Sequence, residues 1–308
     1  VYGPRICACK QYLQKTRRSC RKKIEINRSK VGSAMDYKCV VSDLDLTLLQ
    51  HGDALSEKTK SVLKKLQQKG VLFVPASGRP LCSYPEDVLE IKSLRYIITS
   101  NGAMIYDLLE KQPLWCSKLP EEAAQKICDA LRSNPVAYEC FIDGKAYASR
   151  AYWENPSAFA GNEMIAGYVE RTREPVEDME AFLVVHRKNL DGIDVVVREE
   201  DKPYIRKRIQ EAFDNVYITS SASHLIEISN MESGKHQAVT RLMRRLGIPM
   251  ESVVAFGDGE NDCELLRAAG LGIAVENAVP DCKDAADWIT ETHHEDGVAQ
   301  ALAEIFAL

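Results

Sequence analysis

A short apolar run that ends in two aspartates constrains this chain more than any other stretch. Residues 38–49 have the sequence KCVVSDLDLTLL, in which Cys39-Val40-Val41 precedes Asp43 and Asp45. A continuous apolar run is typical of a strand buried in a parallel sheet, and ligands bind at the carboxyl ends of such strands. Two carboxylates this close repel each other unless a cation or a shared proton lies between them. The stretch therefore predicts a divalent-metal site at the tip of a first strand.

Length and composition are those of a globular protein. The 308 residues can form one large or two ordinary domains, and 45% of them are hydrophobic, which is enough for a proper core. No uninterrupted apolar stretch of about 18 residues is present, which argues against a membrane-spanning helix, and no secretory signal is visible. The ten cysteines include no CxxC pair. We therefore expect a reduced, cytoplasmic protein.

Charge is distributed unevenly along the chain. Residues 1–34 carry ten Lys or Arg and a single acid, whereas the remainder carries 30 Lys or Arg against 44 Asp or Glu, a formal net charge of −14. An acidic body argues against nucleic acid as the main partner. We expect residues 1–34 to be a poorly ordered basic extension. A dispensable extension, upstream sequence translated from a misplaced start and an acid-poor targeting peptide remain open for this segment.

Strands alternate with helices from Met35 onward. Ser56 is a suitable N-cap for the first helix, and Gly70 is suited to follow its end. This alternation predicts right-handed crossovers and a parallel sheet. The elements expected in this first segment are strands at 38–42, 71–74 and 95–99 and helices at 56–69 and 85–91.

The alternation of strands and helices is then interrupted, and it resumes later in the chain. Residues 104–106 and 113–116 are expected to form a hairpin, and Asp143-Gly144 is a strong signal for a second one. Further helices are expected at 120–131 and 202–213, with strands at 193–197 and 216–219. Alternation resumes with a strand at 225–228, a helix at 235–246 and an apolar strand at 253–256. We therefore predict an α/β core, 35–108 and 221–308, with an inserted α+β cap domain at 109–220.

Four polar clusters follow strands or begin helices of the predicted core. Each is weak alone. Turn aspartates, a βα turn and an exposed lysine explain the first three as well, whereas helix capping explains one acid of the fourth but not three acids with two glycines. The clusters are Asp43 with Asp45, the tripeptide Ser77-Gly78-Arg79, Lys235 after Ser233-Gly234, and Asp258 with Asp262 in the segment GDGEND.

Each cluster also has a chemical interpretation. The Ser77 hydroxyl and nearby backbone N–H groups at a helix start suit an anion. Lys235 at a helix N-terminus opposes the helix dipole, which is easier to understand if an anion or carboxylate lies close by. Asp258 and Asp262 in a glycine-containing turn are oxygen ligands suited to Mg²⁺. A phosphate hydrolase needs this set: a carboxylate nucleophile, a second carboxylate for proton transfer, a hard cation and a lysine.

In this combination the sequence resembles the haloacid dehalogenase superfamily. Its four motifs are matched in order by Asp43-Leu44-Asp45-Leu46-Thr47, Ser77-Gly78-Arg79, Lys235 and the segment GDGEND at 257–262. Asn101-Gly102-Ala103 and the segment 272–278 are similar to the Cof-type branch. The resemblance covers roughly 35–308. It implies a Rossmann-like core with a large α/β cap between the second and third motifs, the interval in which the inserted domain lies.

The resemblance implies a role for each matched residue. Asp43 would attack phosphorus and form an aspartyl-phosphate, and Asp45 would protonate the leaving oxygen and then activate water. The implied phosphate-binding residues are Ser77, Gly78, Lys235 and Asn261, of which Ser77 and Lys235 also count as catalytic. The implied Mg²⁺ ligands are the Asp43 carboxylate, the Asp45 backbone carbonyl and Asp258, with Asp262 close by or acting through water.

One position departs from the family pattern. A glycine usually follows the second aspartate, and here Leu46 stands in its place. A branched side chain narrows the allowed backbone and adds apolar bulk near the entrance to the pocket. Every group that would do chemistry is nevertheless retained.

Together these observations predict a Mg²⁺-dependent phosphatase, a phosphoric monoester hydrolase acting on a small phosphorylated metabolite. Sugar phosphates are favoured, nucleotide, flavin and pyridoxal phosphates remain open, and dehalogenation is disfavoured by the second aspartate. The alternatives are a phosphomutase, or a nucleic-acid or membrane-surface protein acting through residues 1–34. We expect neither nucleic acid nor a membrane surface as a partner, and we expect the protein to be a monomer or a homodimer. In the cap, Asp143-Gly144, Tyr152-Trp153 and Asn155 are candidates for pocket contacts, but a hairpin turn and core aromatic residues are the favoured interpretation.

Overall fold

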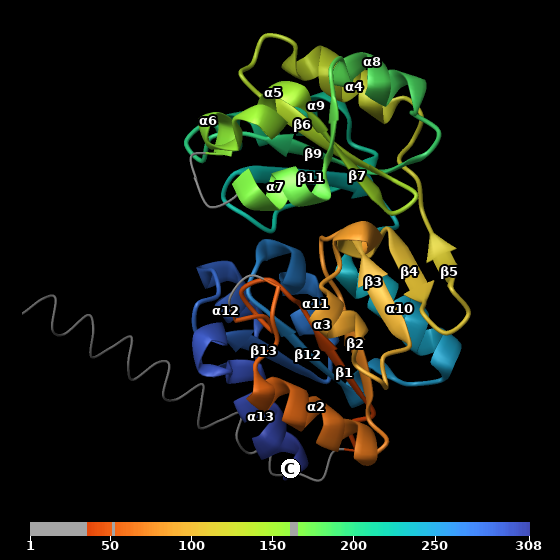
Figure 1. The fold of residues 1–308 in the computed structure, drawn as a ribbon, viewed down its shortest axis with the longest axis vertical. Coiled ribbons are helices and arrows are strands. Elements are labelled where there is room, and N and C mark those ends of the chain that lie inside the picture. The colour runs from red at the N-terminus through yellow and green to blue at the C-terminus, as the bar shows by residue number, and fades with distance from the viewer. Residues whose placement is uncertain (1–35, 51–52, 161–165) are drawn as a thin grey trace, which may run out of the picture.

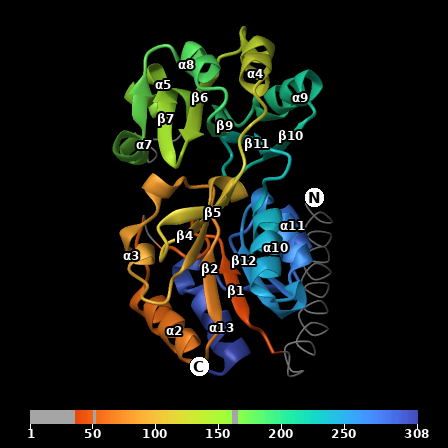
Figure 2. The same ribbon diagram turned by 90° about the vertical axis from the view of Figure 1, so that its right-hand side faces the viewer.

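The computed structural model describes residues 36–50, 53–160 and 166–308. The chain forms a larger and a smaller unit, stacked along the long axis of the molecule (Figures 1 and 2). The predicted basic extension 1–34, and the binding function considered for it, lie outside the described residues. Within those residues, no helix is both long and apolar enough to cross a membrane.

The larger unit is built on a five-stranded parallel sheet with the order β14-β13-β12-β1-β2. The inner strand β1 pairs with β12 on one side and with the edge strand β2 on the other, and all four of its residues are buried. Burial on both faces accounts for the continuous apolar run that precedes Asp43. The predicted parallel α/β core is confirmed. The strands are β1 (Cys39–Ser42), β2 (Leu72–Pro75), β12 (Val253–Gly257), β13 (Leu271–Val275) and β14 (Trp288–Thr290).

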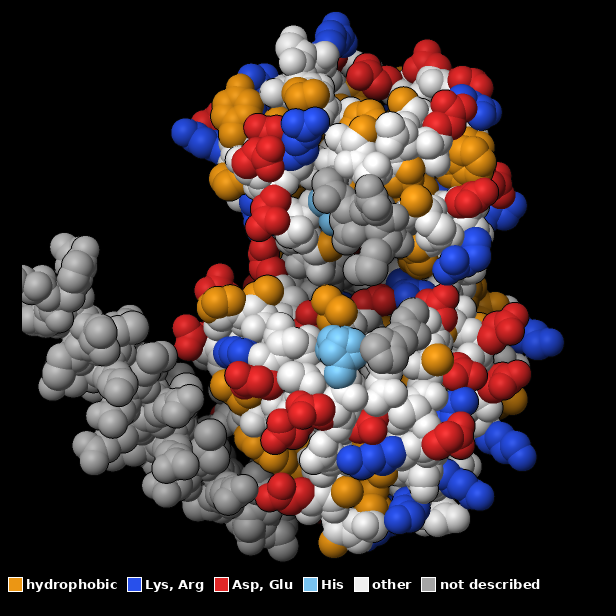
Figure 3. Space-filling view, turned by 60° about the vertical axis from the view of Figure 1, so that its left-hand side comes forward, with side chains coloured by type: hydrophobic (Ala, Val, Ile, Leu, Met, Phe, Trp, Pro, Cys, Tyr) orange, Lys and Arg blue, Asp and Glu red, His pale blue; other side chains and the backbone are white. Residues whose placement is uncertain are grey.

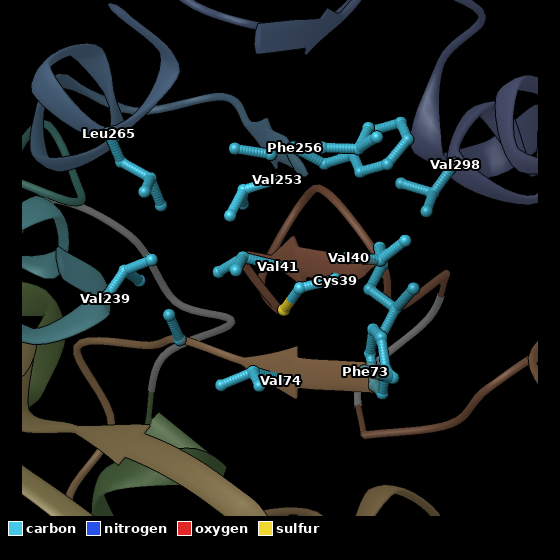
Figure 4. Close-up of a cluster of buried hydrophobic side chains, with 14 of the residues drawn as sticks. Cys39, Val40, Val41, Phe73, Val74, Val239, Val253, Phe256, Leu265 and Val298 are labelled. Atoms are coloured by element: carbon cyan, nitrogen blue, oxygen red, sulfur yellow. The ribbon is translucent and has the colours of Figure 1, made fainter. Parts of the chain in front are cut away.

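Helices cover both faces of this sheet. Successive side chains of a strand point to opposite faces, so Val40 lies on the side of Val298 in α13, whereas Val41 lies on the side of Val239 in α10 (Figure 4). The predicted N-cap is present, because the Ser56 hydroxyl accepts a hydrogen bond from the backbone N–H of Thr59. The helices are α2 (Glu57–Gln68), α3 (Glu86–Leu89), α10 (Lys235–Leu246), α11 (Cys263–Ala268), α12 (Pro280–Ala285) and α13 (Gly297–Phe306).

A three-stranded antiparallel sheet extends the larger unit beside β2. It consists of β3 (Tyr96–Thr99), β4 (Met104–Asp107) and β5 (Gln112–Cys116), in that order. A single parallel bridge between Ala76 and Ile98 joins it to the end of β2. The predicted hairpin after the third strand is therefore present as β4 and β5.

The smaller unit contains a six-stranded sheet with the order β10-β11-β9-β6-β7-β8. Helices α4 (Ala123–Leu131), α8 (Met179–Val185) and α9 (Lys202–Ala212) pack on one face around a core that includes Cys140, Ile193 and Ile228. The strands are β6 (Ala137–Ile142), β7 (Lys145–Ser149), β8 (Glu174–Val176), β9 (Leu190–Val196), β10 (Val216–Thr219) and β11 (Leu225–Asn230). Three short helices complete it: α5 (Arg150–Glu154), α6 (Pro156–Ala160) and α7 (Ala166–Thr172).

The sheets do not follow the predicted domain limits at 109 and 221. Strand β5 pairs with β4 in the larger unit, and β11 lies between β10 and β9 in the smaller one. The reason for the second difference is visible in β11 itself. Ile226 and Ile228 face the helices of the smaller unit, while Glu227 points to the opposite face, and this alternation is typical of an antiparallel strand with one apolar face.

Candidate active site

The predicted site residues gather where β1, β2 and β12 end, at the junction of the two units. The backbone N–H of Asp43 donates to the Phe256 carbonyl at 3.0 Å, which continues the pairing of β1 with β12 and fixes the start of the loop. A cavity of about 240 Å³ opens at these strand ends. Six of the predicted residues line it: Asp43, Asp45, Ser77, Gly78, Asp258 and Asn261.

Lys235 lies behind this cavity and is fully buried at the first turn of α10. Its Nζ donates to Asp43 Oδ1 at 2.5 Å and to Asp262 Oδ1 at 2.7 Å. Burial alone would lower the pKa of Lys235, but the attraction of Asp262 and Asp43 outweighs it and raises the pKa. The lysine is therefore held charged, and the expectation of a carboxylate near this unfavourable helix position is met.

Three carboxylates surround one point at the floor of the cavity. Oxygen atoms of Asp43, Asp258 and Asp262 lie within 4.8 Å of one another. The second oxygen of Asp262 accepts hydrogen bonds from the backbone N–H groups of Asp258 and Gly259, each at 3.1 Å. Thr47 Oγ1 donates to Asp258 Oδ1 at 2.9 Å. Backbone and hydroxyl donors thus fix the directions of the two carboxylates from the β12 loop.

The electrostatics of this cluster fit a bound cation. Burial raises the pKa of Asp43 despite the neighbouring Lys235, and Asp262 and Asp258 raise it further. Burial and the charge of Asp262 also raise the pKa of Asp258 to about 7. Three carboxylates against one lysine leave an excess of negative charge, and an all-oxygen donor set suits a hard divalent cation such as Mg²⁺.

Asp45 does not join the carboxylate cluster. Its two oxygens accept hydrogen bonds from Nε and Nη2 of Arg79, at 2.9 and 2.6 Å. Arg79 also donates to Asp53 at 2.7 Å and to the Ser83 carbonyl at 3.1 Å. Sequence reasoning assigned Arg79 no role. The available signal was chemical, since an arginine directly after a buried strand needs acidic partners.

Ser77 and Asn261 complete the floor of the cavity. The Ser77 hydroxyl is buried and accepts a hydrogen bond from the backbone N–H of Arg79 at 3.1 Å. The Asn261 side-chain amide donates to Asn101 Oδ1 at 2.9 Å. Asn101 has a φ of 51°, a left-handed conformation that asparagine tolerates better than most residues. The stretch after β3 that is similar to the Cof-type branch thus reaches the site through Asn101.

Residues of the smaller unit form the roof of the cavity, and sequence reasoning did not identify them. They come from β6, β9, β11, the segment before β11, and the region of α7. The residues are Phe141, Tyr168, Arg173, Asp194, Ser221, Ala222, His224, Leu225 and Glu227. A signal was present in the strands, where Glu139, Asp194 and Glu227 interrupt apolar residues at alternate positions. Because these strands lie far apart in the sequence, the sequence alone did not indicate that their acids form one surface.

Of the cap residues considered from sequence, Asp143, Gly144 and Tyr152 have the structural roles predicted for them, whereas Trp153 is only partly buried and Asn155 is exposed. Asp143 and Gly144 form the turn between β6 and β7, and the Gly144 carbonyl accepts a hydrogen bond from the backbone N–H of Cys82 at 3.0 Å. Tyr152 is fully buried in a small cluster with Val169. The turn therefore contacts the larger unit, and the tyrosine serves packing.

Polar contacts join the two units around the cavity. Arg206 of α9 forms hydrogen bonds with both carboxylate oxygens of Glu260, which lies between Asp258 and Asp262 in sequence. On another side, Arg173 Nη1 donates to the Ser83 hydroxyl at 3.3 Å. Figure 3 shows acidic and basic side chains gathered at the waist between the units. The smaller unit is thus held over the site as a cap.

A family model described as haloacid dehalogenase-like hydrolase matches residues 40–302. The chain belongs to this family. The predicted superfamily, its branch with an α/β cap, and the predicted enzyme class of phosphoric monoester hydrolase are confirmed.

Individual haloacid dehalogenase-like proteins resemble the chain over most of its length. The 5-amino-6-(5-phospho-D-ribitylamino)uracil phosphatase YcsE of Bacillus subtilis (strain 168) is 27% identical over 272 residues, 87% of this chain and 95% of that protein. A haloacid dehalogenase-like hydrolase from B. subtilis, 26% identical, has a TM-score of 0.73 and matches 86% of this chain and 98% of its own. The subclass IIB sugar phosphatase BT4131, 22% identical, has a TM-score of 0.74 over 88% and 100% of the two chains, and this likeness shows the fold alone.

Proposed function

We propose that this haloacid dehalogenase-like hydrolase is a Mg²⁺-dependent phosphatase for a small phosphorylated metabolite, with sugar phosphates favoured, acting through an aspartyl-phosphate. The observation that carries the proposal is the position of Asp43 at the cavity floor. Lys235 binds its Oδ1, and within the described residues no hydrogen bond is made to its Oδ2. A carboxylate with one oxygen held and the other directed to a cavity is suited to nucleophilic attack.

In the first step, Asp43 attacks phosphorus and the bond to the leaving oxygen breaks. The proton that this oxygen needs comes from Asp45. Phosphoryl oxygens accept hydrogen bonds from the Ser77 hydroxyl, the backbone N–H of Gly78 and the Asn261 amide. The charge of Lys235 offsets the negative charge that develops. In the second step, Asp45 takes a proton from water, which attacks the aspartyl-phosphate and releases phosphate.

Asp45 must change its contacts during this cycle. Both of its oxygens accept from Arg79, and a protonated carboxyl has one oxygen that donates instead. One contact with Arg79 is therefore given up whenever Asp45 carries the proton. Arg79 acts here as a positioning residue that holds Asp45 at the cavity wall.

When bound, Mg²⁺ would neutralise phosphoryl charge and orient the substrate for attack. The residues that would hold it are Asp43, the backbone carbonyl of Asp45 and Asp258, with Asp262 close by. The acidic cluster described above supports this assignment.

The substrate class is supported by the size of the cavity and by a relative. About 240 Å³ suits a small metabolite rather than a polymer. The relative YcsE is named for a phosphorylated ribitylamino compound, whose phosphate is carried by a polyol chain. A phosphorylated sugar or polyol is therefore the proposed substrate.

Release of phosphate from p-nitrophenyl phosphate tests the proposal. The wild-type protein should be active with Mg²⁺ and inactive in EDTA, and Asp43→Asn should lower kcat by about 10³-fold or more. Asp214→Asn, which changes an exposed aspartate of the cap, is the matched control and should keep activity. Full activity of Asp43→Asn, or indifference to EDTA, would overturn the proposal. A phosphorylated isomer in place of free phosphate from a sugar phosphate would favour a phosphomutase.

A further inference from the structure

Three carboxylates lie side by side on the face of the cap sheet that is turned toward the cavity. Glu139 of β6 and Glu227 of β11 are the direct neighbours of Asp194 in β9. The exposed fractions of Glu139, Asp194 and Glu227 are 2%, 6% and 4%. Like charges directly opposite each other on neighbouring strands are destabilising. This row of buried acids therefore calls for a functional explanation.

Two of the three carboxylates have partners within the protein. Arg173 binds Oε2 of Glu139 through Nε at 3.0 Å and Nη2 at 2.9 Å. The Ser221 hydroxyl donates to Oε1 of Glu227 at 2.8 Å, whereas the buried Oε2 of Glu227 has no partner among the described residues. The row thus contains one complete ion pair and one half-satisfied carboxylate.

Asp194 is the member of the row that has no partner among the described residues. No hydrogen bond or ion pair joins its side chain to any residue that the structure describes, although only 6% of Asp194 is exposed and it lines the cavity. An unpaired carboxylate in such a place is costly. Burial, together with the charges of Glu227 and Glu139, raises the pKa of Asp194. A ligand in the cavity that donated hydrogen bonds to Asp194 would remove this cost.

The position of Glu227 connects the row to the phosphate end of the cavity. A Cβ placed on Gly78 would lie 3.1 Å from Oε1 of Glu227 and 3.3 Å from the Asn101 amide nitrogen. Glycine at 78 thus permits the cap carboxylate to approach the loop that is proposed to bind phosphate. A substrate with its phosphate at Ser77 and Gly78 would extend past Glu227 toward Asp194.

The remaining charges of the roof do not favour an anion there. Among the described lining residues, both arginines are already paired, Arg173 with Glu139 and Arg79 with Asp45. Burial, with the nearby charge of Lys202, lowers the pKa of His224 to about 4, so this residue is neutral near pH 7. The part of the substrate that reaches the roof therefore meets acceptors and negative charge.

We propose that Asp194, with Glu227 beside it, is the specificity-determining residue for the organic group of the substrate, to which the phosphate is attached. It selects groups that present hydrogen-bond donors, either hydroxyl or ammonium, and it rejects groups with a second anionic charge. A donor group in the cavity favours the ionised form of Asp194. An ionised carboxylate only accepts hydrogen bonds, and bonds to it are strengthened by its charge. This inference rests on the proposed phosphatase function, which places the phosphate at the opposite end of the cavity.

Two pairs of phosphate esters test the inference. At the end remote from the phosphate, sorbitol 6-phosphate carries a hydroxymethyl group and 6-phosphogluconate carries a carboxylate. The wild-type protein should prefer sorbitol 6-phosphate by about tenfold or more in kcat/KM, because like charges at a buried contact are strongly disfavoured. Asp194→Asn and Asp194→Ser should each reduce this preference by about tenfold or more. The exposed Asp214→Asn should keep the wild-type ratio.

The second pair identifies the donor. Glucosamine 6-phosphate carries an ammonium group at the position where glucose 6-phosphate carries a hydroxyl. A preference for glucosamine 6-phosphate that disappears in Asp194→Asn assigns the site to an ammonium. If Asp194→Asn lowers kcat/KM equally for both substrates, relative to its kcat/KM for p-nitrophenyl phosphate, the site is assigned to hydroxyls.

The failures of the inference and of the proposed function give different results. If the wild-type protein releases no phosphate from p-nitrophenyl phosphate with Mg²⁺, the phosphatase proposal fails. If p-nitrophenyl phosphate is hydrolysed but 6-phosphogluconate is preferred, the specificity inference is overturned. An unchanged substrate ratio in both Asp194 variants would also overturn it, while the phosphatase function would stand. Activity toward p-nitrophenyl phosphate shows at the same time that each variant is folded.

Discussion

Arg79 holds both carboxylate oxygens of Asp45, with Nε 2.9 Å from Oδ2 and Nη2 2.6 Å from Oδ1. Asp45 follows Asp43 by two residues, yet the two carboxylates have different surroundings. Asp43 is buried against Lys235, while half of the Asp45 side chain is exposed. Two acids of one motif are thus separated into a nucleophile candidate and a proton-transfer candidate by the partners that tertiary structure supplies.

Replacing Arg79 should impair the transfer of the proton by Asp45. Lysine has a single ammonium and cannot form the two-pronged contact of a guanidinium. We expect Arg79→Lys to lower kcat for p-nitrophenyl phosphate by about tenfold or more, with the requirement for Mg²⁺ unchanged. Arg171→Lys is the matched control, because Arg171 lies 3.8 Å from Asp53 on the exposed surface. A wild-type kcat in Arg79→Lys would contradict the positioning role.

The stability of the metal-free protein should depend on pH through the carboxylate cluster. Burial and Asp262 raise the pKa of Asp258 from 3.8 to about 7. Between these values the folded protein retains a proton that the unfolded chain has lost, so stability falls as pH rises through this range. Metal binding requires deprotonated ligands, and Mg²⁺ should therefore raise Tm more at about pH 8 than at about pH 5.

Thermal unfolding in EDTA and in Mg²⁺, at both pH values, checks this prediction. Asp258→Asn is the control, since an amide at this position does not titrate and should flatten the pH dependence of Tm in EDTA. The prediction is wrong if wild type and Asp258→Asn show the same dependence of Tm on pH.

Leu46 should carry a cost in stability that glycine would relieve. Its φ is 56° and 54% of its surface is exposed, and a left-handed backbone costs a non-glycine residue about 1–2 kcal/mol. Leu46→Gly should raise Tm relative to Leu46→Ala, which keeps the strained backbone. Both variants remove side-chain bulk from the cavity wall, so both should accept larger aryl phosphates. A lower Tm for the glycine variant than for the alanine variant would refute the strain argument.

Gly102 should be required for the position of Lys235. Its φ is 86°, and a Cβ there would lie 2.4 Å from the Gly234 carbonyl oxygen, immediately before α10. Gly70 has a similar φ of 73° with nothing within 4 Å of the added Cβ, which makes Gly70→Ala a matched control for backbone strain. Gly70→Ala should cost about 1–2 kcal/mol in unfolding free energy. Gly102→Ala should cost about 1–3 kcal/mol more and should also lower kcat.

Urea unfolding and steady-state kinetics on both variants measure these effects. Equal stability of the two alanine variants, with wild-type kcat in each, would show that the contact between Gly102 and Gly234 does not position the lysine.

Much of the larger unit could be predicted because its signals are local. The run Cys39-Val40-Val41 indicates a strand buried on both faces, and it forms the inner strand β1 between β12 and β2. The helix at 235–246 was predicted with the observed bounds. The unfavourable place of Lys235 at its start indicated a neighbouring carboxylate, and the structure places two there. Such inferences succeed because the periodicity and capping chemistry of an element are contained in its own residues.

The sequence by itself determined the family, the parallel core and the chemical types gathered at the strand ends. Tertiary structure alone decided which of these groups meet. The contact of Lys235 with Asp43 spans 192 positions, and the pairing of Arg79 with Asp45 depends on how two loops approach. The row of Glu139, Asp194 and Glu227 depends on the register of three strands. A shift of one residue would turn each acid to the opposite face of the sheet, so only the assembled fold brings this row to the cavity.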